Sequence, residues 1–159
     1  MASTITASTL KVTIREDIKL NGVDHGGVTT LNIGSINEIS KRIITITTTE
    51  STIATFSSAV ASAGHYVAAD VRYIRFTNLD DTNFITLTFR NQDNDEAAIK
   101  LDSGQSFIWN GDNSNGMTAV LNATEDADAA SDTAFGSLTN IQADANTGSC
   151  DLEMFIAST

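Results

Sequence analysis

The chain has 159 residues, of which 41% are hydrophobic and 18% charged, and this is the composition of one globular domain. Its single cysteine excludes an internal disulfide, so folding does not require an oxidising compartment. The formal net charge of −11 argues against nucleic acid as a partner, because that binding depends on neutralising phosphates with Lys and Arg.

Segments in which apolar and polar residues alternate recur along the chain, separated by Asn, Asp and Gly and never by proline. Because successive side chains of a strand point to opposite faces, such alternation predicts strands with one buried and one solvated face. In chain order, the predicted strands cover residues 10–20, 41–48, 53–56, 71–78, 83–90, 98–101, 106–110, 117–123 and 150–157.

The segment before residue 41 is less regular than the rest. Residues 1–9 are rich in Ser, Thr and Ala and are predicted to be a flexible or docking arm. Glu16 interrupts the apolar face of the first strand, which indicates a bulge or an edge. Residues 21–27 read as a turn, and residues 28–39 are expected to hold a short strand and a turn.

Three later connections are also predicted from local composition. Residues 57–64 show a faint helical spacing that Ser and Thr dilute, so a strand end followed by a loop is expected. The LDDT segment at residues 79–82 lies between two predicted strands and is expected to be a hairpin turn. Residues 124–132 are acidic and rich in Ala, which predicts a loop or a short helix.

Together these elements predict an all-β fold with little helix. Roughly eight to ten strands in one domain are typical of an antiparallel β-sandwich of jelly-roll-like design. We expect residues 10–159 to form this single sandwich domain, since no internal repeat and no linker interrupts them.

The charge is unevenly placed along the chain. Residues 1–79 hold seven Lys/Arg and six Asp/Glu, whereas residues 80–159 hold two Lys/Arg and fourteen Asp/Glu. The nearly neutral first half is therefore the expected docking surface, and the acidic second half the expected solvated surface.

Side chains with catalytic or metal-binding chemistry are sparse. His25 and His65 stand forty positions apart, whereas a metal site needs three or four ligands held together. Cys150 lies among apolar residues, which is typical of a small core side chain rather than a nucleophile. We therefore expect no catalytic residue, no cofactor and no enzymatic activity.

The acidic clusters could supply oxygen ligands to calcium, although solvated turn acids are the commoner explanation. These clusters are Asp80–Asp81, Asp93 with Asp95 and Glu96, and Glu125 with Asp126 and Asp128. The DNSNG loop at residues 112–116 resembles the start of a calcium loop, but its glycine comes one position early and no closing Glu follows. No metal site is assigned, and calcium binding stays open.

Three strand residues have simpler interpretations than binding. Trp109 shares its parity with Phe107, so it is expected to pack in the core rather than to hold a sugar. Arg72 and Arg75 fall on opposite parities, so they form ion pairs on a strand surface rather than a basic stripe.

Three stretches carry a resemblance to a known group of proteins. They are KRIITITTTESTIATF at residues 41–56, VRYIRFTNLDDTNFITLTF at 71–89 and AIKLDSGQSFIW at 98–109. With the NLDDTN turn, the L-x-x-G-x-S-F turn at residues 101–107 and the short closing strand, the pattern resembles small β-structured virion proteins of tailed phages, especially those of marine and cyanobacterial hosts. That group includes head-decoration (cement) proteins and other accessory structural proteins.

The resemblance implies a capsid decoration protein on the outside of the head, bound to the major capsid protein or other virion proteins. A homo-oligomer, with a trimer favoured, would stabilise the lattice by its binding free energy. The alternatives are a tail, neck or fibre component, or a carbohydrate-binding β-sandwich for host-surface recognition. We expect synthesis in the host cytoplasm and no membrane association, because the start lacks a signal sequence and no apolar run approaches roughly 20 residues.

Overall fold

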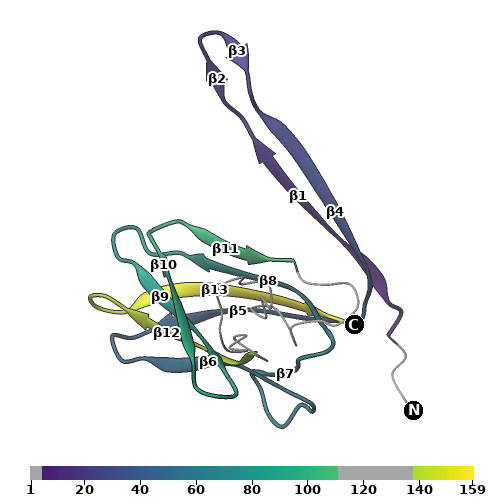
Figure 1. Cartoon of the computed structure of the whole chain (residues 1–159), viewed down its shortest axis with the longest axis vertical. Coiled ribbons are helices and arrows are strands. Elements are labelled where there is room, and N and C mark those ends of the chain that lie inside the picture. The colour runs from purple at the N-terminus through teal and green to yellow at the C-terminus, as the bar shows by residue number, and fades with distance from the viewer. Residues whose placement is uncertain (1–4, 111–137) are drawn as a thin grey trace, which may run out of the picture.

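The computed structural model describes residues 5–110 and 138–159, and every regular element within these ranges is a β-strand. Two sheets lie face to face as a sandwich, and a long hairpin stands outside them (Figure 1). The predicted fold class, an all-β sandwich, is confirmed.

The sandwich is built from nine of the described strands. Four form a sheet in the order β11-β8-β13-β5, and five form a sheet in the order β10-β9-β12-β6-β7. Neighbouring strands are antiparallel except for β6 and β7, which are parallel. Their bounds are β5 Glu38–Ile46, β6 Ser51–Ser57, β7 His65–Val67, β8 Val71–Asn78, β9 Ile85–Asn91, β10 Glu96–Leu101, β11 Ser106–Trp109, β12 Leu138–Ala145 and β13 Cys150–Ser158.

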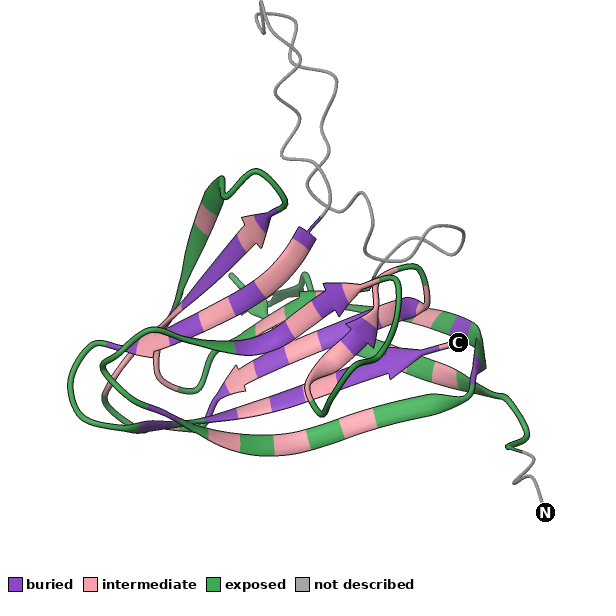
Figure 2. Ribbon diagram, turned by 90° about the horizontal axis from the view of Figure 1, so that it is seen from below, coloured by how far each residue is buried: buried purple, intermediate pink, exposed green. Residues whose placement is uncertain are grey.

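The core lies between the two sheets, and buried residues alternate with partly buried or exposed ones along many of the strands (Figure 2). On β13 the inward residues Leu152, Met154 and Ile156 are almost wholly buried, and they face residues such as Ile141 of the other sheet. Burying one such aliphatic side chain stabilises the fold by about 1.5–3 kcal/mol, so the pattern of alternation dictates which face of each strand is internal.

Residues 8–36 form a separate two-stranded structure, called here the hairpin arm, which projects from the sandwich (Figure 1). β1 (Ser8–Glu16) pairs with β4 (Gly27–Ile36), and the short strands β2 (Lys19–Leu20) and β3 (Val23–Asp24) continue the hairpin to its tip. The turn at Asn21 and Gly22 has φ angles of 51° and 81°, as the type I′ turn of a two-residue hairpin requires. The sheets of the sandwich thus begin at Glu38, whereas the sequence placed the start of the sandwich domain at residue 10.

Two backbone features shape the hairpin arm. The predicted interruption at Glu16 is where β1 ends, and Glu16 pairs with Gly27. The preceding Gly26 comes so close that a Cβ atom there would stand 2.3 Å from the Glu16 carbonyl oxygen. Near the base the register of β1 and β4 shifts by one residue, and Ser35 has a φ of 60°. This bulge increases the local twist and bend of the strand, which is a physical cause of the change in direction between the hairpin arm and the sandwich.

The predicted hairpin turn at residues 79–82 is wrong. β8 and β9 lie in different sheets, so this segment crosses from one layer of the sandwich to the other. Asp80 caps the crossing, because its Oδ1 accepts hydrogen bonds from the backbone N–H groups of Thr82 and Asn83 at 2.9 and 2.6 Å. Asx capping of this kind suits an arch as well as a hairpin, so local sequence does not distinguish them.

Other expectations for single segments have mixed outcomes. Residues 28–39 hold most of the ten-residue strand β4 rather than a short strand and a turn. Residues 57–64 finish β6 and continue as a loop, as predicted. The predicted strand at 117–123 and the predicted loop or helix at 124–132 lie outside the described residues.

Candidate functional site

The hairpin arm exposes several large apolar side chains, which are spread over both of its faces. Among the described residues these side chains are Ile14, Ile18, Leu20, Val23 and Val28, with exposed fractions between 45% and 66%. An isolated two-stranded hairpin is marginally stable in water, because two strands alone bury too little apolar surface. The outer part of the hairpin arm is therefore the described surface with the strongest physical reason to be covered by something else.

The base of the hairpin arm, by contrast, is fixed to the sandwich. Ile33 and Ile36 are buried against Tyr73 and Ala157 on the outer face of the four-stranded sheet. The Tyr73 ring meets the ring of Phe155 edge-on, with their centroids 5.8 Å apart. This second apolar cluster is why Tyr73 and Ile74, neighbours on opposite faces of β8, are both buried.

Beyond this cluster an open groove of about 320 Å³ separates the hairpin arm from the sheet. Leu10, Val12 and Ile14 line one wall, and Ile108 and Phe155 belong to the other. Lys11, Thr13, Tyr73 and Arg75 also line the groove, so its lining combines an apolar majority that can accept apolar side chains with a few polar groups.

An ion-pair network crosses the same outer face. Glu153 on β13 contacts Arg75 on β8 and Lys41 on β5, with Oε2 of Glu153 3.1 Å from the Lys41 ammonium. Hydrogen bonds from Arg75 and then Lys41 lower the pKa of Glu153 below its ordinary value. Burial raises the pKa of the nearby Tyr73 phenol, although Arg75 acts in the opposite direction. Arg75 therefore forms the ion pair expected from the sequence, and Arg72 donates to the Ala69 carbonyl oxygen instead.

The 79–84 crossing and the 102–105 turn meet at the end of the sandwich. Asn78, which is wholly buried, donates from Nδ2 to the carbonyl oxygens of Asn83 and Leu101, at 2.8 and 3.1 Å. The hydroxyl of Ser103 donates to the Asp80 carbonyl oxygen at 2.7 Å. These bonds join the 79–84 crossing to the 102–105 turn and close one end of the fold.

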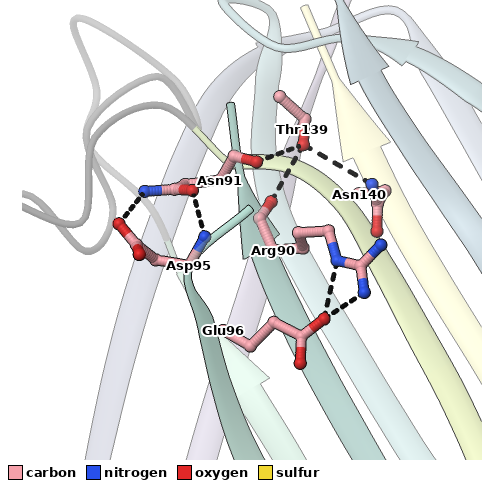
Figure 3. Close-up of polar contacts among 6 residues, drawn as sticks. All are labelled: Arg90, Asn91, Asp95, Glu96, Thr139 and Asn140. Carbon is pink, nitrogen blue, oxygen red and sulfur yellow. Dashed lines mark hydrogen bonds and ion pairs between the residues drawn. The ribbon is translucent and has the colours of Figure 1, made fainter. Parts of the chain in front are cut away.

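A second polar cluster orders the start of β12 and the β9–β10 turn (Figure 3). The Thr139 hydroxyl lies 3.0 Å from the carbonyl oxygens of both Arg90 and Asn91. Asn91 accepts from the Asp95 N–H and donates to the Asp95 carboxylate at 3.1 Å, and Arg90 pairs with Glu96. The acids of this turn thus bind groups of their own chain, as loop-closing residues do.

The candidate calcium clusters show the same pattern wherever they are described. Asp80 caps backbone N–H groups, which lower its pKa, and Asp81 accepts from the Thr82 hydroxyl. Asp93 accepts a hydrogen bond from Gln92 at 3.3 Å. Within residues 5–110 and 138–159, no three His, Cys, Asp or Glu side chains gather as metal ligands would. Glu125, Asp126, Asp128 and the loop at 112–116 lie outside the described residues.

The remaining candidates lie far apart. His25 follows β3 near the tip of the hairpin arm, and its backbone N–H donates to the Ile18 carbonyl oxygen. His65, by contrast, begins β7 in the sandwich. Cys150 is a buried core residue, as predicted, and burial and the neighbouring Asp80 raise the pKa of its thiol. Trp109 packs against the core, also as predicted.

Sequence reasoning missed the hairpin arm, although a signal for it was present. The Asn21–Gly22 dipeptide between alternating apolar residues is the strongest short-range sign of a β-hairpin. Irregular spacing in residues 28–39 obscured it, because the bulge at Ser35 shifts the parity of the apolar residues.

No protein-family model and no curated protein matches the chain. Among solved structures, a similar chain comes from work described as "Bacillus endospore appendages form a novel family of disulfide-linked pili". The two chains are 8% identical, with a TM-score of 0.41, over 100% of this chain and 95% of that one. A likeness of this degree carries no argument about fold or function. The described part of the chain has no helix long and apolar enough to span a membrane.

Proposed function

We propose that this chain is a structural subunit of a tailed-phage virion, and specifically a capsid decoration protein on the outside of the head. The observation that carries the proposal is the hairpin arm, which projects from a sandwich that already has its own core and which exposes large apolar residues. Such a projection is the expected form of a segment that docks on a larger assembly. The phage assignment rests on the resemblance in residues 41–109.

The distribution of charge supports docking through the hairpin arm. Lys11, Arg15 and Lys19 balance Glu16, Asp17 and Asp24, so the hairpin arm has no net formal charge and the rest of the chain carries the whole −11. Six acidic residues lie where strands end away from the base of the hairpin arm, namely Glu50, Asp80, Asp81, Asp102, Asp144 and Asp151. Other acidic residues lie elsewhere, with Glu38 and Asp70 near that base and Asp93, Asp95 and Glu96 in the β9–β10 turn.

The geometry of β13 separates these two regions. Ser158 of β13 pairs with Glu38 next to the base of the hairpin arm, whereas Cys150 pairs with Ile46 near the acidic loops. A strand of this length spans roughly 27 Å at about 3.3 Å per residue. The acidic end can therefore face solvent while the neutral hairpin arm binds the particle, and each bound copy would stabilise the assembled lattice by mass action.

The alternatives differ in how well the described surface suits them. A carbohydrate-binding sandwich needs exposed aromatic rings, and every aromatic residue among those described is buried or partly buried. A tail, neck or fibre component would use the hairpin arm in the same way as a head protein, so location decides between them. The homo-oligomer, with a trimer favoured, stays a prediction.

Mass spectrometry of purified heads and tails of the phage that encodes the chain tests this proposal. We expect the chain in the head fraction; its presence only in tails would favour the alternative, and its absence from both would end the virion assignment. A combined Ile14→Thr, Leu20→Thr and Val28→Thr variant should show lower occupancy on heads. The matched control is Ile39→Thr with Ile43→Thr, because these residues are similarly exposed on the sandwich and not on the hairpin arm.

A further inference from the structure

The outer edge of β4 is an unprotected strand edge. β4 pairs with β1 on one side, and among the described residues no strand pairs with its other side. Its ten residues, GVTTLNIGSI, contain no charged residue and no proline. Residues 27–33 pair with β1 in regular register before the bulge, which gives an uninterrupted run of seven residues. The unpaired N–H and C=O groups of such an edge are a template for another strand.

The other long edges in the described part of the chain have the usual protection. β1 carries Lys11 and Arg15 along its length, and the outermost strand β5 carries Lys41 and Arg42. β10, an outermost strand of the five-stranded sheet, carries charges near both of its ends. Charged side chains of this kind discourage edge-to-edge pairing, so their absence from β4 singles that edge out for an intermolecular contact.

Charge also indicates which strand the β4 edge would accept. Like charges directly opposite each other destabilise a strand pair, and β4 has none to oppose. Two whole chains repel each other through −11 on each, but two hairpin arms carry no net charge and can approach without that repulsion. A second copy of β4 therefore meets the electrostatic requirements of this edge.

We propose that β4 of one chain pairs antiparallel with β4 of a second copy, around a two-fold axis at Thr30. In this register Thr29 stands opposite Leu31 of the other copy, so both apolar faces lie on the same side of a four-stranded sheet, β1-β4-β4-β1. Two marginal hairpins thereby become one wider sheet, and each tip lies beside the base of the other hairpin arm. The inference deepens the assembly role proposed above and rests on it, and it puts a two-fold dimer in place of the trimer that the sequence favoured.

Cysteine cross-linking at one cross-strand pair tests this arrangement. Thr30 and Thr13 are both exposed, lie directly opposite each other in the hairpin arm, and have their hydroxyl oxygens 3.3 Å apart. Across the two-fold axis the two Thr30 Cα atoms would be about 4.5–5.5 Å apart, within disulfide range. The two Thr13 Cα atoms would be separated by three strand spacings, roughly 14 Å, which no disulfide can bridge.

We expect Thr30→Cys to form a covalent dimer under mild oxidation, with about tenfold less from Thr13→Cys under the same conditions. The buried Cys150 is common to both variants and does not distinguish them. Equal cross-linking of the two variants, or none in either, would overturn the proposed register.

A charge at the same position gives an independent measurement. Thr30→Lys places two lysines opposite each other at the axis and should convert the dimer to monomer in light scattering, whereas Thr13→Lys should leave it intact. Since both substitutions alter the same pair within the hairpin arm, any loss of folding affects them alike. A wild-type trimer that Thr30→Lys leaves unchanged would contradict the proposal.

These measurements use the purified chain without a phage particle. Failure of cross-linking together with the chain in purified heads would reject the β4 contact and leave the virion role standing. A cross-linked dimer together with absence of the chain from heads and tails would reject the virion role and support the β4 contact alone.

Discussion

Asn78 at the end of β8 donates a hydrogen bond from its side chain to the carbonyl oxygen of Leu101 at the end of β10, 3.1 Å away, and these strands belong to different sheets. The Oδ1 atom of the same side chain accepts a hydrogen bond from the backbone N–H of Asp80 at 3.0 Å. One buried amide therefore holds the two layers together where the chain crosses between them twice. A neutral amide suits this place, because it donates and accepts without the cost of burying a charge.

Replacement of this amide should have a large effect on stability. We expect Asn78→Ala to lower the free energy of unfolding by about 3 kcal/mol, since it leaves buried carbonyl oxygens and an N–H without partners. Urea unfolding monitored by Trp109 fluorescence measures the change. Asn32→Ala, at an exposed position of the hairpin arm, is the control and should change stability by less than about 0.5 kcal/mol. Equal effects of the two substitutions would show that the bonds of Asn78 contribute nothing specific.

The ion pairs of Glu153 predict a dependence of stability on pH. Arg75 and Lys41 lower the pKa of this carboxyl in the folded state, so the ionised form stabilises the fold above the ordinary value of 4.5. That contribution is lost as the pH falls from about 4.5 through the lower folded pKa. We therefore expect the stability gap between wild type and Glu153→Gln to be widest near neutral pH and to narrow in acid. Urea midpoints measured from pH 7 to pH 3 give the gap, and parallel curves would argue against the network.

Because the base of the hairpin arm is buried in its own apolar cluster, a substitution there should destabilise the hairpin arm alone, whereas a substitution in the main core should destabilise the whole fold. Ile33→Ala removes apolar contacts with Tyr73 and should release the hairpin arm, since two strands alone are marginal. Ile141→Ala opens a cavity in the main core and should cost about 2–5 kcal/mol of global stability. Hydrogen exchange separates the two. The first variant should lose protection mainly in residues 8–36, and a uniform loss across the chain would contradict a separately attached hairpin arm.

The sequence predicted a strand well where the chain's own core buries one face of that strand, and less well where no other part of the chain does. β8 matches the predicted residues 71–78, and β13 extends one residue beyond the predicted 150–157, because both strands alternate against a core within the same chain. In the hairpin arm the same alternation placed Ile14 and Ile18 on an apolar face, yet both remain about half exposed. Alternation shows which residues share a face, but it does not show whether the chain itself covers that face.

The turns show a second limit of local sequence. Asp80 forms the hydrogen bonds of an Asx turn, which serve a hairpin and a crossing between sheets equally well. β9 pairs with its sequence neighbour β10 on one side and with β12 on the other, and β12 is a segment distant in sequence that was not predicted as a strand. Thr139 and Asn140 at its start are two consecutive polar residues, which interrupts the alternation of apolar and polar residues. The Thr139 hydroxyl donates to the Arg90 and Asn91 carbonyl oxygens rather than packing in the core.

The buried thiol of Cys150 gives the last prediction. Its side chain is wholly inside the core, and burial raises its pKa above the ordinary 9.0, so little reactive thiolate forms and none of it meets solvent. Native protein should therefore react with an aromatic disulfide reagent only as fast as the core opens, and unfolded protein at the rate of a free thiol. Asn78→Ala should accelerate the native reaction, because it weakens the end of the sandwich where Asp80 and Cys150 meet. Rapid labelling of the folded wild type would mean that this end opens readily and that the two turns do not close it.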